Sequence, residues 1–168
     1  TRAYGADVVY YQRGVESRED IGADLARECG LTLVKPYDDA AVIAGQGTVG
    51  LELSEQIAER ELSASTILCC CGGGGLSAGI ATAMAATNPE ITLHTVEPEG
   101  YDDTARSLSL GERVANDTEQ GSICDAIVTP TPGELTFPIL KELAGGGFVV
   151  SDDQTLRAMH YAFDTLKL

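Results

Sequence analysis

Residues 67–79 read Ile-Leu-Cys-Cys-Cys-Gly-Gly-Gly-Gly-Leu-Ser-Ala-Gly, an apolar run followed by four glycines and a helix-like start. Consecutive residues without a Cβ let backbone N–H groups approach an anion closely. A helix N-terminus adds unpaired N–H donors and the positive end of the helix dipole. One or two glycines would be enough for a turn, so the run of four predicts a cradle for a phosphate group.

The residues around the four glycines indicate which kind of phosphate ligand the loop could bind. A Walker A loop places Lys and then Ser or Thr after its last glycine, but Leu76 stands there. In the dinucleotide fingerprint G-x-G-x-x-G, Gly72 and Gly74 fit, whereas Gly79 lies two positions too late. Glu97 does close the next predicted strand, so a nucleotide-binding Rossmann-like domain stays open. A cradle made of backbone alone suits a phosphate monoester.

Strand and helix patterns alternate along the chain. Extended segments are predicted at residues 8–11, 31–34, 66–71, 91–96 and 148–150. Helices are predicted at 17–28, 38–44, 49–60, 75–87, 104–110, 137–144 and 152–167, with Gly45 and Gly47 separating the second from the third. This alternation predicts an α/β fold with a three-layer, mostly parallel, twisted sheet flanked by helices. Ligands bind at the carboxyl ends of such strands, where the glycine run and Glu97 lie.

The composition excludes several classes of function. The chain has 168 residues, of which 43% are hydrophobic, and a net charge of −15, which argues against a nucleic-acid partner. No apolar run approaches the roughly 20 residues of a membrane span, and no signal peptide is visible, so we expect a cytoplasmic protein without a membrane partner. Five cysteines, three of them adjacent at 69–71, predict buried thiols rather than disulfides. The chain starts without Met and ends after an apolar helix, so we expect a fold that is incomplete at both ends.

Acidic residues gather in the segment Val-Glu-Pro-Glu-Gly-Tyr-Asp-Asp at 96–103. Glu97 leaves a predicted strand, and Asp102 and Asp103 precede a predicted helix. One of the two aspartates is predicted to cap that helix. Two carboxylates with backbone carbonyls also suit a hard cation such as Mg²⁺ or Ca²⁺. The two roles are compatible because adjacent acids can divide them.

Four segments together resemble the fold-type-II pyridoxal phosphate enzymes of the threonine dehydratase and serine racemase group. They are Ile43–Thr48, Cys71–Gly79, Val96–Pro98 and Ser122–Ala126, in this order. The resemblance implies a fold like that of the tryptophan synthase β subunit. Residues 1–34 would be part of the small domain and residues 35–168 part of the large cofactor-binding domain. It also implies pyridoxal 5′-phosphate as cofactor, a small amino acid as substrate and a homodimer.

The resemblance also implies roles for single residues. The amides of the glycine run and of the next residue would hold the cofactor phosphate, and an aspartate would lie beside the cofactor ring. Some family members place a hydroxyl near the substrate carboxylate, and the serine racemase-like members bind a divalent cation. The matching residues are Gly72, Gly73, Gly74, Gly75 and Leu76 for the phosphate, Asp125 for the ring, Thr129 for the substrate, and Glu97, the Tyr101 carbonyl and Asp103 for Mg²⁺ or Ca²⁺.

The chain departs from the family pattern at its lysines. The family binds the cofactor covalently through a lysine in a Ser-x-Lys segment, but only Lys35, Lys141 and Lys167 occur here, and none has that context. We therefore assign no catalytic residue and expect the chain alone to be inactive. The resemblance implies that the full enzyme converts threonine, serine or 3-hydroxyaspartate to a 2-keto acid and ammonia. A non-catalytic or regulatory paralogue of the same fold is the main alternative.

Overall fold

The computed structural model describes residues 1–12, 15–117 and 121–168. Its chain divides into two compact units, Thr1–Val34 and Lys35–Leu168. The division falls at the residue where the family resemblance places the domain boundary. That the units are parts of a small domain and of a cofactor-binding domain stays a prediction.

The first unit contains the helix α1 (Arg18–Cys29), preceded by a short 3-10 helix at Arg2–Tyr4. Ser17 caps α1, because its side chain accepts a hydrogen bond from the Asp20 N–H, and the helix ends at Gly30 with a left-handed φ of 65°. Residues 8–11 form no strand, so the prediction of a strand there is wrong. A strand needs a neighbour to satisfy its backbone groups, and the described part of this unit offers none.

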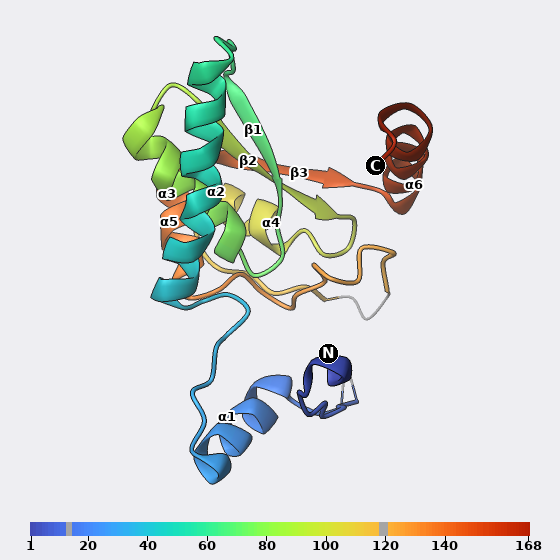
Figure 1. Cartoon of the computed structure of the whole chain (residues 1–168). Coiled ribbons are helices and arrows are strands. Elements are labelled where there is room, and N and C mark those ends of the chain that lie inside the picture. Colours follow the sequence, from blue (N-terminus) through green and yellow to red (C-terminus); the bar gives the residue numbers. More distant parts are fainter. Residues whose placement is uncertain (13–14, 118–120) are drawn as a thin grey trace. The chain divides into compact units, whose positions relative to one another are not determined.

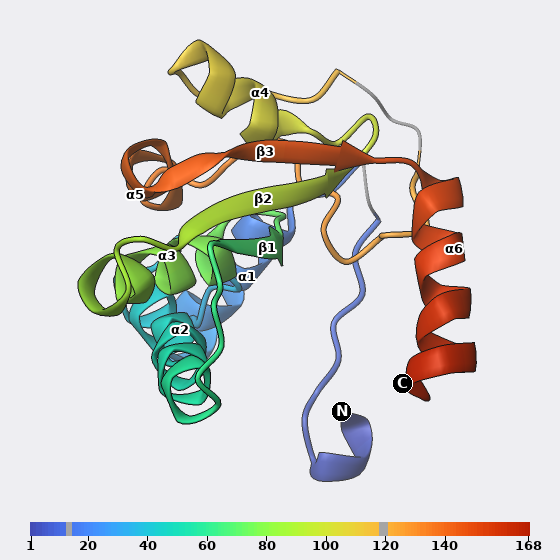
Figure 2. The same ribbon diagram turned by 90° about the horizontal axis from the view of Figure 1, so that it is seen from above.

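A three-stranded parallel sheet lies at the centre of the second unit (Figure 1). Its order is β1 (Thr66–Cys70), β2 (Thr92–Pro98) and β3 (Ala144–Val150), as Figure 2 shows from above. The helices are α2 (Ala40–Glu59), α3 (Gly75–Thr87), α4 (Asp103–Leu110), α5 (Thr136–Leu143) and α6 (Asp152–Tyr161). A parallel sheet flanked by helices confirms the predicted α/β class.

The core lies on one face of this sheet. Cys69 of β1 pairs in register with Thr95 of β2, so both side chains point to the same face, and both are buried. Helix α3 contacts this face through Ser77, whose hydroxyl donates to the Cys69 sulfur at 3.3 Å. The opposite face carries Leu68, which is 63% exposed, and Phe148, which is 51% exposed.

The prediction that the cysteines are buried is only partly right. All five are free thiols, but only Cys69 and Cys71 are buried, whereas Cys29 and Cys70 are exposed. Cys70 is exposed because successive residues of a strand point to opposite faces. The prediction that the cysteines are small buried residues therefore holds for two of them.

Helix α2 is one continuous helix of 20 residues, so the predicted break at Gly45 and Gly47 is wrong. Asp39 caps its start, because one carboxylate oxygen accepts the N–H groups of Ala41 and Val42 at 2.9 and 3.2 Å. Helix α2 packs along α3 (Figure 1), and glycine residues allow the two helices to come close.

Glycine backbones make the contact between α2 and α3. A Cβ on Gly79 of α3 would lie 2.5 Å from the carbonyl oxygen of Ile43 and 2.6 Å from the nitrogen of Gly47. A Cβ on Gly47 would lie 3.2 Å from the Gly79 carbonyl oxygen. The two helices therefore touch at a distance that leaves no room for a side chain at Gly79 and little room for one at Gly47.

Two C-terminal elements differ in length from the sequence prediction. β3 begins at Ala144 rather than at residue 148 and runs through three glycines. A Cβ on Gly147 would lie 2.6 Å from the Cβ of Ala105, so glycine lets α4 pack against the strand. Helix α6 ends at Tyr161 and continues as a π-helical turn over Ala162–Leu166. Among the described residues, no helix combines the length and apolarity needed to cross a membrane.

We predict that Gly79→Ala lowers the free energy of unfolding by about 1–3 kcal/mol, because the new methyl group has to push α3 away from α2. Gly45→Ala is the matched control in α2, since a Cβ there meets no atom within 4 Å. It should stabilise the helix by up to about 1 kcal/mol, the usual gain of Gly to Ala. Urea unfolding measures both changes, and a Gly79→Ala protein as stable as the parent would contradict the close contact.

Candidate functional site

The glycine loop, residues 72–75, leaves the carboxyl end of β1 and enters α3 directly. Gly74 occupies the N-cap position of α3 with a left-handed φ of 88°, and it has no side chain with which to cap the helix. The first intrahelical bond runs from the Ala78 N–H to the Gly74 carbonyl at 2.8 Å. The N–H groups of Gly75, Leu76 and Ser77 therefore lie in a first turn that has neither intrahelical acceptors nor a capping side chain at the N-cap, as an anion cradle requires.

Neighbouring segments lie so close to the loop that Gly73 and Gly74 leave no room for a side chain. A Cβ on Gly73 would lie 2.2 Å from the ring of Tyr37, and one on Gly74 would lie 2.9 Å from the Thr136 hydroxyl oxygen. The Gly73 carbonyl accepts the Thr136 hydroxyl at 2.7 Å and the Gly133 N–H at 3.3 Å. The loop is thus held from the start of α5 and from the segment before α2.

Asp38 connects the segment before α2 to the residue that precedes α5. One of its carboxylate oxygens accepts the Leu135 N–H at 2.7 Å, across 97 residues of sequence. Asp38 itself adopts a left-handed φ of 58°. Our sequence reasoning missed Tyr37 and Asp38. The string Asp-Asp before a helix is a signal for a cap, which Asp39 provides, but nothing local indicates that Asp38 reaches a loop so far along the chain.

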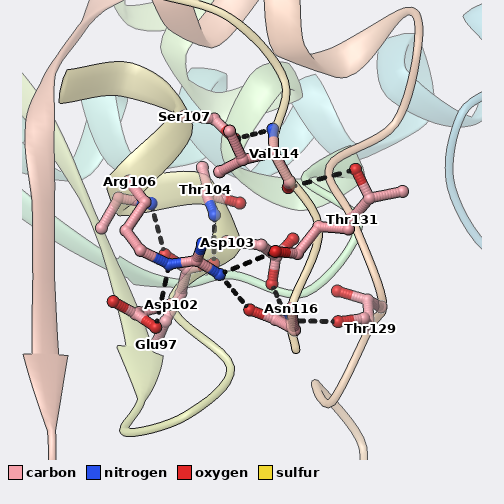
Figure 3. Close-up of polar contacts among 12 residues, drawn as sticks. Glu97, Asp102, Asp103, Thr104, Arg106, Ser107, Val114, Asn116, Thr129 and Thr131 are labelled. Carbon is pink, nitrogen blue, oxygen red and sulfur yellow. Dashed lines mark hydrogen bonds and ion pairs between the residues drawn. The ribbon is translucent and has the colours of Figure 1, made fainter. Parts of the chain in front are cut away.

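The buried carboxylate of Glu97 caps α4 (Figure 3). Its two oxygens accept the N–H groups of Thr104 at 3.0 Å and Ala105 at 2.7 Å, and the residue is 1% exposed. Asp102 stands at the N-cap position, but no cap hydrogen bond comes from its side chain, which pairs with Arg106 at 3.3 Å. The prediction that Asp102 or Asp103 caps this helix is wrong, because a glutamate from the preceding strand reaches the same N–H groups.

Asp103 is fully buried beside Glu97 and has one carboxylate oxygen without a partner. Its Oδ1 accepts the Asn116 side-chain N–H at 2.6 Å, whereas Oδ2 is buried and has no hydrogen-bond partner within the described ranges. Burial raises the pKa of Glu97 to about 7 and that of Asp103 to about 6. Two carboxyl groups that are costly to ionise, one of them with a free lone pair, form an environment that a cation would stabilise.

The other predicted residues lie on the loops that follow β2 and α4. The Tyr101 N–H donates to the Pro98 carbonyl at 2.9 Å, which forms a turn between Glu97 and Asp103. Thr129 is half-buried, and its hydroxyl oxygen is buried with no hydrogen-bond partner in the described part of the chain. Asp125 is exposed. Across residues 1–12, 15–117 and 121–168, no cluster of three or more His, Cys, Asp or Glu side chains could hold a metal ion.

Asp152 anchors the segment that precedes Asp125. Its carboxylate accepts the Ser122 hydroxyl at 2.7 Å and the Ile123 N–H at 3.3 Å. Asp152 lies in the first turn of α6, so this helix holds a segment that precedes it by about 30 residues. The sequence singled out residues 122–126 by their pattern but gave no sign of the aspartate that holds them.

Known proteins resemble the chain along its whole length. The model of the family described as "Pyridoxal-phosphate dependent enzyme" matches residues 1–168. The L-threo-3-hydroxyaspartate ammonia-lyase of a Pseudomonas species is 39% identical over all 168 residues, which cover 51% of that protein. The crystal structure of a threonine deaminase from T.th. superposes with a TM-score of 0.91 at 42% identity, over 99% of this chain and 54% of that one. The structure of maize serine racemase superposes with a TM-score of 0.89 at 34% identity, over 99% of this chain and 51% of that one. The chain thus spans about half the length of the curated relatives it matches.

We predict that Glu97→Gln lowers the free energy of unfolding by about 1–3 kcal/mol in the absence of divalent cations. The new amide group would bring an N–H donor against the N–H groups of Thr104 and Ala105, which leaves at least one buried donor unpaired. Glu99→Gln is the control, since Glu99 is exposed two residues further on; it should stay within about 0.5 kcal/mol. Urea unfolding decides, and equal midpoints for both variants would contradict the capping role of Glu97.

Proposed function

Because the chain belongs to the family of pyridoxal-phosphate dependent enzymes, we propose that the intact protein is an ammonia-lyase of the dehydratase type. It would convert a hydroxy amino acid (threonine, serine or 3-hydroxyaspartate) to a 2-keto acid and ammonia. The relatives named as hydroxyaspartate ammonia-lyase and threonine deaminase support this class of reaction. The observation that carries the proposal is the glycine loop at the start of α3, whose uncapped N–H groups suit a phosphate monoester.

The residues of the loop fit the phosphate of pyridoxal 5′-phosphate. A Cβ at Gly73 would collide with Tyr37, and one at Gly74 would lie 2.9 Å from the Thr136 hydroxyl oxygen, so the loop can keep this backbone path only with glycine at both positions. The residues that would hold the phosphate are Gly72, Gly73, Gly74, Gly75 and Leu76. When bound, the cofactor would supply an acceptor for the electrons released at the substrate α-carbon.

The chain's own residues would bind and orient rather than transfer protons. Asp125 would lie beside the cofactor ring, and Thr129 would lie near the substrate carboxylate. The anchoring of residues 122 and 123 by Asp152 supports a fixed position for Asp125. The Lys141 ammonium donates to the Gly111 carbonyl at 2.7 Å, a contact that gives no support to a role as the cofactor-binding lysine.

We also propose that Glu97, the Tyr101 carbonyl and Asp103 bind Mg²⁺ or Ca²⁺. The unpartnered Oδ2 of Asp103 and the raised pKa values of both acids support a cation that would pair with them in their ionised forms. Hard cations take such carboxylate and carbonyl oxygens as ligands. A homodimer in the cytoplasm is part of the same proposal and has the family resemblance as its support.

The reaction is tested by giving the intact protein, reconstituted with pyridoxal 5′-phosphate, each of L-threonine, L-serine and L-threo-3-hydroxyaspartate. We expect 2-keto acid and ammonia to appear in equal amounts from at least one of them. Cofactor binding without product from any of the three would overturn the lyase and favour a non-catalytic paralogue. Binding of a dinucleotide in place of pyridoxal 5′-phosphate would favour the Rossmann-like alternative.

We predict that Gly74→Ala weakens the binding of pyridoxal 5′-phosphate by about ten-fold or more. A non-glycine residue with this left-handed φ costs about 1–2 kcal/mol, and its methyl group would lie 2.9 Å from the Thr136 hydroxyl. The N–H groups of the first turn would therefore shift. Gly45→Ala, whose Cβ meets open space, is the control. Titration of the cofactor measures both affinities, and an unchanged affinity in Gly74→Ala would argue against the phosphate cradle.

A further inference from the structure

Two loop segments, residues 113–116 and 129–132, are joined by hydrogen bonds next to α4 (Figure 3). The Asn116 N–H donates to the Pro130 carbonyl at 2.9 Å, and the Thr131 hydroxyl donates to the Val114 carbonyl at 3.4 Å. Further along, Arg113 donates to the Pro132 carbonyl at 2.9 Å. The second segment carries Thr129, and the first lies beside Asp103 through Asn116.

The side chain of Asn116 joins three partners from different parts of the chain. Its Nδ2 donates to Asp103 Oδ1 at 2.6 Å and to the Thr129 carbonyl at 2.8 Å. Its Oδ1 accepts Arg106 Nη2 at 2.6 Å. Nδ2 therefore faces two acceptors, and Oδ1 faces a donor. The opposite orientation of the amide would place an oxygen against a carboxylate and a carbonyl, so the network fixes the amide in one orientation.

Arg106 holds the acceptor end of Asn116 in place. The guanidinium also donates to the Ala115 carbonyl at 3.2 Å and pairs with Asp102 at 3.3 Å. Asp102 and Asp103 are adjacent. The Arg106 guanidinium connects the first carboxylate to the loop, and the neutral Asn116 amide connects the second. An aspartate in place of Asn116 would keep the pair with Arg106 but would bring a second negative oxygen to Asp103.

The two residues that this amide joins through its Nδ2, Asp103 and Thr129, each have a buried oxygen atom without a partner in the described part of the chain. Asp103 Oδ2 and Thr129 Oγ1 both lack a hydrogen bond among the described residues, although each residue is held through its other oxygen by Asn116. A carboxylate fixed by a ligand at Oδ2 would fix Oδ1 as well, because the group is planar. Oδ1 in turn fixes the amide that sets the position of the Thr129 backbone.

We propose that Asn116 is a positioning residue that couples a cation at Asp103 to the position of the Thr129 loop. Cation binding would order the loop through the Asp103–Asn116–Thr129 contacts, and the ordered loop would bind substrate more tightly. The part that concerns substrate rests on the proposed function. The part that concerns the order of the loop depends on the cation alone and can be tested without any turnover.

The first test is hydrogen–deuterium exchange of the intact protein with and without Mg²⁺, in the absence of substrate. In the parent, Mg²⁺ should slow the exchange of the amides of residues 127–129 and 131. In Asn116→Ala, Mg²⁺ should leave their exchange unchanged. Thr131→Val is the matched control, because it removes a hydrogen bond between the same two segments without touching Asp103 or Thr129. It should retain the effect of Mg²⁺.

Asn116→Asp is a second variant that keeps the size of the side chain in case the alanine protein does not fold. It replaces both donors by oxygen and should also lose the effect of Mg²⁺ on the loop. Exchange that responds to Mg²⁺ equally in the parent and in either folded Asn116 variant would overturn the proposal. So would a parent protein whose loop does not respond to Mg²⁺ at all.

The second test uses whichever hydroxy amino acid the protein turns over. Mg²⁺ should lower KM in the parent and in Thr131→Val by about five-fold or more, the usual lower range for coupling between two sites. In the Asn116 variants, KM should be raised and should no longer depend on Mg²⁺, with a smaller change in kcat. A KM that keeps its dependence on Mg²⁺ in these variants would overturn the coupling. If no substrate is turned over, the proposed function falls, while the exchange experiment still decides the role of Asn116.

Discussion

Backbone contact between α2 and α3 is the constraint on which the rest of the second unit depends. Gly79 lies so close to the Ile43 carbonyl that a Cβ would be 2.5 Å away, which fixes α3 along α2. Because α3 starts at the fourth residue of the glycine loop, fixing the helix also fixes the loop and the direction of its N–H groups. Dispersion and backbone packing, rather than a large apolar side chain, hold this contact, and they do so because interiors are packed without voids. The small-residue composition of both helices follows from the same requirement.

The elements next to the glycine loop could be predicted from sequence because local pattern and tertiary role agree there. β1, α3 and α4 begin and end within one residue of their predicted bounds. The errors arise where tertiary contact reverses local propensity. Gly45 and Gly47 indicate a break by propensity alone, but α2 continues because packing against α3 outweighs a cost of about 1 kcal/mol per glycine. Residues 8–11 show the converse, since a β-prone stretch stays irregular where the described unit provides no neighbouring strand.

The candidate site divides in the same way between what a sequence can and cannot encode locally. The glycine run and Glu97 are visible because each directly follows a strand of a parallel sheet, where ligands gather. Tyr37, Asp38, Asn116 and Asp152 cannot be recognised from the sequence, since each contacts residues outside its own helix, strand or loop. Asp38, for instance, reaches Leu135 across 97 residues. The cap of α4 shows how such contacts mislead, because Asp102 has the right residue type and position but Glu97 makes the hydrogen bonds.

These long-range contacts assign distinct tasks to the two sides of the site. On the phosphate side, the Gly73 carbonyl is held by the Thr136 hydroxyl and the Gly133 N–H, so the loop amides are oriented by donors that bear no charge. On the acidic side, the buried Asp103 accepts the Asn116 amide, while the buried Glu97 accepts two backbone N–H groups. The one guanidinium pairs with Asp102, so the carboxyl groups outnumber the cationic side chain. A phosphate needs donors and a divalent cation needs acceptors, so the unit keeps the two ligand types apart by their chemistry. Both sides are built from loops at the carboxyl ends of β1 and β2, and the segment from 127 to 136 touches each of them. That shared segment is the physical reason to expect that a change on the acidic side is felt where the cofactor and substrate would bind.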